Sequence, residues 1–97
     1  MEKQIELETP KPRYLFGDMW KEGEYHKATL LDVVTEKSKD GSKDLPYLHI
    51  KVLMEEAGTI PEFLLSKWRA KVNDRRFVLI IGKEYRLTKS EENFIFS

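Results

Sequence analysis

The sequence predicts a single, mainly β domain that combines five strands with one short helix between the third and fourth strands. Three features lead to this prediction. Apolar and polar residues alternate with a period of two in residues 47–54, as expected for a strand with one buried face. Turn-forming pairs such as Asp40-Gly41 separate the strand-like segments. After the third segment, Leu65, Trp68 and Val72 recur at helical spacing.

Length and composition exclude several classes of protein. The 97 residues suffice for one small domain with one core, and 40% hydrophobic residues are too many for a disordered chain. The net charge is zero, so a nucleic acid would have to be held by a local basic patch. The chain has no cysteine, which excludes disulfides and cysteine-based metal sites. Without a signal sequence or a membrane-spanning run, we expect a soluble cytoplasmic protein, in the host cell if viral, with no membrane partner.

Two prolines near the N-terminus set the domain boundary. Residues 1–13 are predicted to be a flexible N-terminal arm, because Pro10 and Pro12 block regular structure, and residues 14–97 form the domain. The apolar run 14–20 is expected to cap an open end of the core. Residues 25–37 form the first strand.

That first strand breaks the simple alternation of a sheet. It contains the adjacent apolar pairs Leu30-Leu31 and Val33-Val34, which indicate a bend or a bulge. The polar residues 38–44 then form a loop.

The second strand is predicted at 47–54 and the third at 59–65. In the second strand, one face carries aliphatic side chains, and the other carries Tyr47, His49 and Lys51. Pro61 makes the start of the third strand an edge or a bulge.

The predicted helix follows the third strand. Ser66 is its expected N-cap, and it should end near Asn73-Asp74. Residues 77–81 are predicted to be fully buried because they are the most apolar run. Strands at 84–89 and 94–96 complete the domain.

Four short motifs resemble small single-domain barrels of phages, archaeal viruses and plasmids, a group similar to single-stranded DNA-binding proteins. The motifs are Lys21–Tyr25, Ala28–Val33, Leu64–Lys67 and Ile81–Leu87. The resemblance covers Phe16 to Thr88 and implies a five-stranded OB-like Greek-key barrel, with the helix between strands three and four. In such barrels, the face of strands two and three and the loops after strands one and four carry the nucleic acid. The positions that this implies are Tyr47, His49, Lys51, Phe63, Lys39, Lys43 and Lys67.

The residue types support this interpretation, and each also has a structural alternative. Aromatic rings stack bases and cations neutralise phosphates, but the same face of strand two would also suit a merely solvated surface. The densest basic run comprises Lys67, Arg69, Lys71, Arg75 and Arg76. It is either a phosphate-binding surface or a solvated helix face. Trp20 and Trp68 are either core residues or additional aromatic contacts.

Catalysis is not predicted. His26 and His49 lie on different strands without metal-ligand spacing, and Asp32 has no identifiable catalytic partner. We therefore expect no catalytic residues, no metal and no cofactor.

The sequence thus predicts a non-catalytic protein that binds single-stranded DNA with little sequence preference, in replication, recombination or repair of a viral or plasmid genome. Two alternatives remain open. One is an RNA-binding barrel. The other is a protein-interaction module of a mobile element, in which Tyr14, Leu15, Phe16 and Trp20 contact a second copy or a replication or recombination protein.

Overall fold

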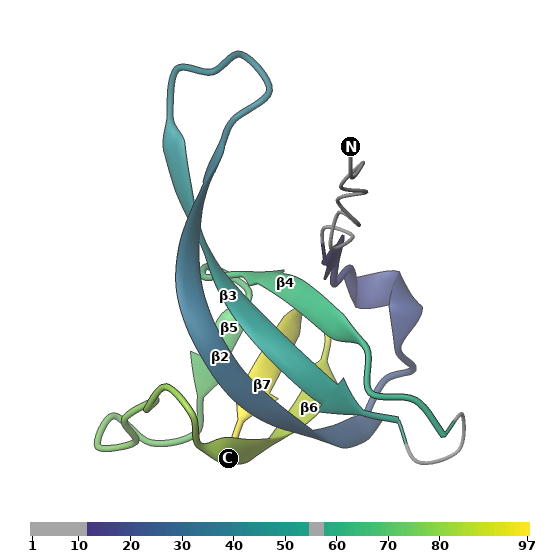
Figure 1. Cartoon of the computed structure of the whole chain (residues 1–97). Helices are drawn as coiled ribbons and strands as arrows, with labels where there is room; N and C mark the ends of the chain where they lie inside the picture. The colour runs from purple at the N-terminus through teal and green to yellow at the C-terminus, as the bar shows by residue number, and fades with distance from the viewer. Residues whose placement is uncertain (1–11, 55–57) are drawn as a thin grey trace, which may run out of the picture.

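The structure is a computed structural model that describes residues 12–54 and 58–97. Its elements in chain order are β1 (Arg13–Tyr14), the 3-10 helix η1 (Gly17–Met19), β2 (Tyr25–Lys37), β3 (Asp44–Leu53), β4 (Glu62–Ser66), β5 (Ala70–Val72), β6 (Glu84–Ser90) and β7 (Asn93–Phe96) (Figure 1). Most of the predicted N-terminal arm lies outside the described residues. Its last residue, Arg13, belongs to β1.

All seven strands belong to one mixed sheet, in the order β1-β4-β3-β2-β6-β7-β5. The four central pairings are antiparallel, whereas β1 pairs with β4 and β5 pairs with β7 in parallel. The β2–β3 hairpin projects well beyond the rest of the sheet (Figure 1). The two short parallel strands, β1 and β5, form the edges.

The predicted five-stranded barrel is wrong. The sheet curls strongly, because β4 and β5 occupy distant places in the strand order although only the turn Lys67–Arg69 separates them. Among the described strands, however, no ladder joins β4 to β5 or to β7. The fold is therefore an open, all-β sheet of seven strands.

The predicted helix after Ser66 is also wrong. Ser66 is the last residue of β4, its carbonyl accepts a hydrogen bond from Arg69 N (3.1 Å), and β5 follows at once. A helix of so few residues is unfavourable, because its nucleation costs more free energy than its local contacts contribute. As the strand β5, residues 70–72 instead pair with β7, which gives backbone groups of both strands hydrogen-bond partners. Within the described ranges, no helix is long and apolar enough to cross a membrane.

The register of the central strands agrees with the sequence pattern. The pairing of β2 with β3 shifts between Leu30 and Asp32, which confirms the predicted bulge. On β3, Leu48, Ile50 and Val52 are buried, as their alternation predicts. The residues between and beside them, Tyr47, His49, Lys51 and Leu53, therefore face the opposite side, which we call the outer face of the sheet.

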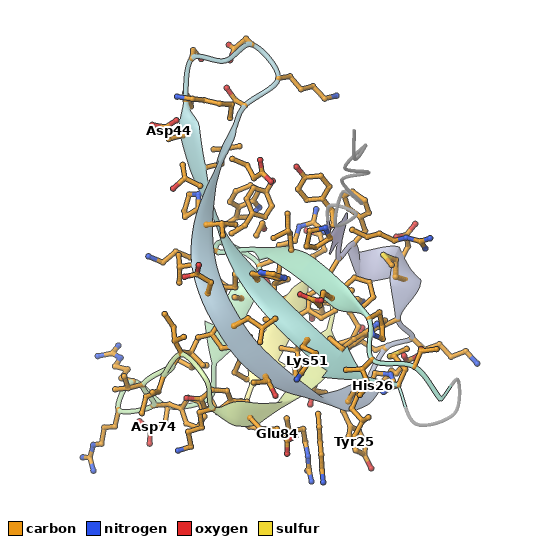
Figure 2. All side chains as sticks on the ribbon, in the orientation of Figure 1. Tyr25, His26, Asp44, Lys51, Asp74 and Glu84 are labelled. Carbon is orange, nitrogen blue, oxygen red and sulfur yellow. The ribbon has the colours of Figure 1, made fainter. Side chains whose placement is uncertain are left out.

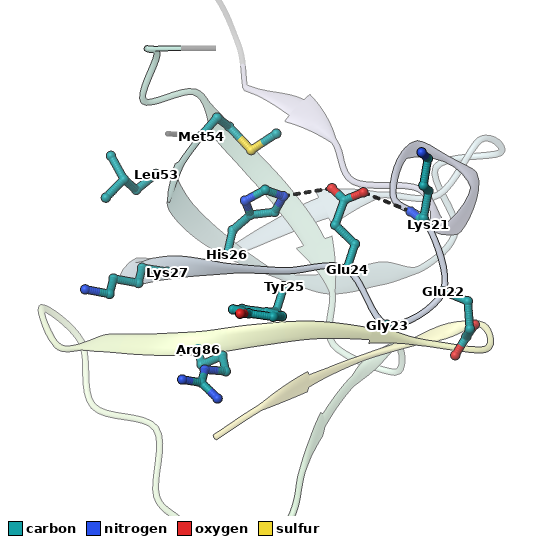
Figure 3. Close-up of a pocket in the computed structure, with 10 residues that line it drawn as sticks. All are labelled: Lys21, Glu22, Gly23, Glu24, Tyr25, His26, Lys27, Leu53, Met54 and Arg86. Carbon is teal, nitrogen blue, oxygen red and sulfur yellow. Dashed lines mark hydrogen bonds and ion pairs between the residues drawn. The ribbon is translucent and has the colours of Figure 1, made fainter. Parts of the chain in front are cut away.

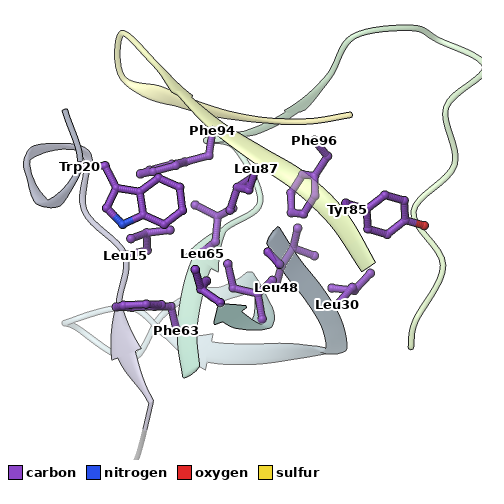
Figure 4. Packing of buried hydrophobic residues seen from close by; sticks show 13 residues of the cluster. Leu15, Trp20, Leu30, Leu48, Phe63, Leu65, Tyr85, Leu87, Phe94 and Phe96 are labelled. Carbon is purple, nitrogen blue, oxygen red and sulfur yellow. The ribbon is translucent and has the colours of Figure 1, made fainter. Parts of the chain in front are cut away.

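The core lies on the concave side of the curled sheet and is rich in aromatic rings (Figure 4). Phe94 and Phe96 of β7 are fully buried, and Leu15 and Trp20 from the N-terminal segment complete the cluster. The Trp20 ring meets that of Phe94 edge-on, with the ring centroids 5.3 Å apart. Leu15 and Trp20 therefore cap the core, as expected for this part of the run.

The apolar segment 77–81 is not fully buried, which corrects another prediction. It forms no strand, and Val78, Ile80 and Ile81 are each more than half exposed. The segment is held by the Tyr85 hydroxyl, which accepts a hydrogen bond from Ile80 N (2.7 Å) and donates one to Val78 O (3.2 Å). Phe77 and Leu79 pack half-buried against the core, whereas Val78, Ile80 and Ile81 stay at the surface.

Candidate nucleic-acid interface

The outer face of β3 carries three of the predicted binding residues. Tyr47, His49 and Lys51 alternate with the buried residues of the same strand, so they share the face opposite to the core. Figure 2 shows Lys51 toward the end of β3. The period of two in the sequence is sufficient to place these side chains together.

Four aromatic rings form a continuous row on this side of the molecule. The ring centroids of Phe16 and Tyr14 are 6.2 Å apart, those of Tyr14 and Tyr47 are 5.3 Å apart, and those of Tyr47 and Trp68 are 6.1 Å apart. The rings come from β1 and the segment after it, from β3, and from the turn between β4 and β5. We call Phe16, Tyr14, Tyr47 and Trp68 the aromatic row.

Strand pairing positions the row. β1 pairs with β4 so that Tyr14 lies opposite Leu64, and Leu64 in turn lies opposite His49 of β3. The turn that carries Trp68 is tied to β3 by the hydrogen bond from Lys67 N to Pro46 O (3.2 Å). The row is therefore built on backbone hydrogen bonds of the sheet, which holds the rings in place without a ligand.

The rings at the two ends of the row are accessible. Trp68 is 53% exposed and Phe16 is 55% exposed, whereas Tyr14 and Tyr47 between them are half-buried. Trp68 is therefore not a core residue. A contiguous apolar surface of this kind often marks a binding site, and every nucleobase offers a π-face that can stack on the rings.

Two predicted aromatic contacts lie elsewhere. Phe63 lies opposite Ile50 in the core and is only 6% exposed, so it does not share the outer face with Tyr47. Trp20 is also buried, with its ring against Phe94 and His26. Neither ring can stack a base without unpacking the core.

The cations nearest the row differ in their surroundings. Lys67 is exposed beside Trp68, and Arg69 is half-buried with its guanidinium close to Gly17. On β3, Lys51 lies opposite Glu62, whose carboxylate is 2.7 Å from His49 Nε2. The positive charge of this part of the face is therefore partly offset by Glu62.

The remaining predicted lysines, Lys39 and Lys43, are exposed in the loop that ends the projecting hairpin. Asp40 shapes this loop. Its carboxylate accepts hydrogen bonds from the side chain of Ser38 and from the backbone and side chain of Ser42, which lower its pKa to about 2. The loop is ordered by these contacts and presents its lysines at a distance from the aromatic row.

Sequence reasoning did not assign Tyr14 and Phe16 to a nucleic-acid site, because it treated residues 14–20 as one apolar run. The alternation of residues within the run indicates which of these side chains are exposed. Leu15 is buried while Tyr14 and Phe16 are not, which is the period of two of an edge strand. Only the pairing of β1 with β4 shows that these two rings join Tyr47.

In the described part of the chain, no three His, Cys, Asp or Glu side chains gather closely enough to hold a metal ion. Comparison with protein-family models, with curated proteins and with solved structures found no match. A proposal for the function of this protein therefore rests on the geometry of the outer face.

Proposed function

We propose that this protein binds single-stranded nucleic acid, without catalysis and with little sequence preference, on the outer face of its sheet. The observation that carries the proposal is the aromatic row: four rings in consecutive contact, two of them more than half exposed, on a face that also carries lysines. The proposal does not require a barrel, because an open sheet places the same side chains on one surface.

The rings would provide most of the affinity. Stacking of one base on an aromatic side chain contributes about 1–3 kcal/mol, so bases on Trp68 and Tyr47 give moderate binding. Each phosphate neutralised by a cation such as Lys67 adds salt-dependent affinity. Because the net charge of the chain is zero, these local contacts must act without general electrostatic attraction.

Stacking explains the expected lack of sequence preference, since every base has a π-face. Single strands are favoured over duplexes because only unpaired bases can reach the rings. We propose DNA before RNA as the bound polymer. A role in replication, recombination or repair of a viral or plasmid genome stays a prediction from the sequence resemblance.

Fluorescence anisotropy with a labelled single-stranded oligonucleotide tests the proposal. We expect binding that weakens with salt, resists competition by duplex DNA and is displaced by unlabelled single strands. Unlabelled DNA and RNA of the same sequence rank the two polymers. No binding at low salt, where charges are least screened, would overturn the proposal.

A second candidate function is contact with another protein, and a specific observation supports it. Val78, Ile80 and Ile81 expose aliphatic side chains on a segment held by Tyr85. This surface replaces the N-terminal patch predicted from the sequence, because Leu15 and Trp20 are in the core. Self-association that persists at high salt and is abolished by Ile80→Ser would favour this function.

A further inference from the structure

The outer face continues past β3 onto β2 and β6, where a second aromatic and cationic group lies. Lys27 of β2 lies opposite Leu53 of β3 on one side and opposite Arg86 of β6 on the other. Tyr25, two residues before Lys27, therefore shares its face. We call Tyr25, Lys27 and Arg86 the Tyr25 patch. Sequence analysis gave none of these residues a role.

The geometry of the Tyr25 patch suits one nucleotide. The Arg86 guanidinium lies over the Tyr25 ring, 5.0 Å from the ring centroid, and the close-up view shows this stacked pair (Figure 3). The ring is nevertheless 60% exposed. One face of the ring is thus covered by a cation and the other is open to a base, while Arg86 and Lys27 are available to phosphate oxygens.

The backbone around the patch is well held. Arg86 exchanges two backbone hydrogen bonds with Ser97, of 3.0 and 2.9 Å, and Tyr25 lies opposite Thr88 in the β2–β6 ladder. The exposed ring therefore sits on a rigid strand, and little ordering cost accompanies binding.

Both cations and carboxylates surround the patch. The patch borders a pocket of about 830 Å³ that is also lined by Lys21, Glu22 and Glu24. Both carboxylates have other partners. Glu24 lies 2.7 Å from His26 Nε2 and accepts a hydrogen bond from Lys21 N, which lowers its pKa, and Glu22 accepts a hydrogen bond from Glu91 N.

The cations of the lining are Lys21, Lys27 and Arg86. Glu84, which lies opposite Thr29, is a carboxylate of the same outer face. Glu22, Glu24 and Glu84 balance these three cations, so Arg86 and Lys27 must act on phosphate by direct contact and not through an excess of positive charge.

We infer that Tyr25, Lys27 and Arg86 form a second nucleotide subsite, so that one single strand crosses the outer face from the aromatic row to β6. This inference rests on the proposed function. The two subsites are separated by the part of β3 between Tyr47 and Leu53, which is about 20 Å at roughly 3.3 Å per residue. An oligonucleotide must therefore exceed a minimum length to occupy both.

Oligonucleotide length provides the test. Affinities of the full chain are measured for a short oligothymidylate of about 4 nucleotides and a long one of about 16. Tyr25→Ala should weaken binding of the long strand by about 5- to 150-fold and leave the short strand unaffected. Tyr47→Ala should weaken both. Tyr25→Phe, which keeps the ring, should retain the affinity of the unmodified chain for the long strand.

The outcomes separate the two proposals. If the unmodified chain binds neither oligonucleotide, the proposed function itself fails. If Tyr47→Ala weakens binding but Tyr25→Ala and Arg86→Gln leave the long strand unaffected, the second subsite is overturned and the proposed function stands. Lys27→Gln gives an independent readout, because loss of one phosphate contact lowers the salt slope for the long strand by about 0.7.

Discussion

The rings of Tyr14 and Tyr47 lie 5.3 Å apart, centroid to centroid and tilted by 57°, although the strand β4 separates β1 from β3. The two side chains reach across Leu64 of β4, which is in register with Tyr14 and is only 3% exposed. This contact joins the N-terminal segment to the centre of the sheet. It makes the aromatic row continuous and leads to the following predictions.

Removing a ring from the row should weaken binding without unfolding the protein. We expect Tyr47→Ala and Trp68→Ala each to lower affinity for single-stranded DNA by about 1–3 kcal/mol, measured by anisotropy. Trp68→Phe should lose less, because a ring remains. Unchanged affinity in both alanine variants, with an unchanged circular dichroism spectrum, would exclude the row from the site.

Lys67 should contribute one phosphate contact. In Lys67→Gln, the slope of log affinity against log salt should fall by about 0.7 for a single strand. Lys71→Gln is the matched control, because Lys71 belongs to β5 and lies opposite Ile95 of β7, outside the turn that carries Trp68, and should not change the slope. Equal slopes in both variants and the unmodified chain would show that Lys67 does not contact phosphate.

Asp40 should titrate at low pH. The hydrogen bonds from Ser38 and Ser42 lower its pKa from 3.8 to about 2 in the folded protein. Because the folded pKa is the lower one, this carboxylate stabilises the folded state above about pH 4, and that contribution disappears as the pH falls through about 2. NMR titration of the Asp40 carboxyl group measures the value. Ser38→Ala should raise it, and a midpoint near 3.8 in the unmodified chain would contradict the hydrogen-bonded loop.

Ser66→Ala should stabilise the protein. Ser66 is buried in β4, and its hydroxyl has no hydrogen-bond partner in the described part of the chain. Removing a buried, unsatisfied hydroxyl should increase the free energy of unfolding by about 1 kcal/mol, measured with urea. Ser38→Ala is the control with the opposite expected sign. The Ser38 hydroxyl donates a hydrogen bond to Asp40, so its removal should lower the free energy of unfolding. A destabilised Ser66→Ala protein would show that the hydroxyl has a partner.

Tyr85→Phe should release the exposed segment 77–81. The substitution removes the hydrogen bonds to Ile80 N and Val78 O but keeps the ring packed against Phe96. We expect a loss of about 1–3 kcal/mol in unfolding free energy and faster hydrogen exchange at the Ile80 amide. The exposed Tyr25→Phe serves as the control for loss of a hydroxyl. Unchanged exchange at Ile80 would mean that other contacts hold the segment.

Local patterns predicted the central strands well. The first predicted strand coincides with β2, including its bulge, and the alternation of β3 predicted which side chains are buried. The same reasoning failed between Ser66 and Ile81. There, Leu65, Trp68 and Val72 imitate helical spacing by chance, and the decisive interaction is the pairing of β5 with β7, whose partners are distant in the sequence.

The sequence predicted only part of the candidate site, because local patterns do not show which distant segments pair. Tyr47, His49 and Lys51 follow from one strand's alternation, but Phe63 turned out to lie in the core, and Tyr14 and Phe16 were not recognised. Their place beside Tyr47 depends on β1 adding to the edge of β4, a pairing of only two residues. Such a short edge strand carries too little local signal to be predicted.

The sequence by itself determined the mainly β character, the central strands and which face of β3 is polar, because these depend on the period of two and on turn residues. The tertiary structure alone decided that the sheet stays open, that residues 67–72 form a turn and a strand, and that four rings meet on one surface. Those features arise from pairings between distant segments, in which backbone hydrogen bonds and shared burial outweigh local propensity.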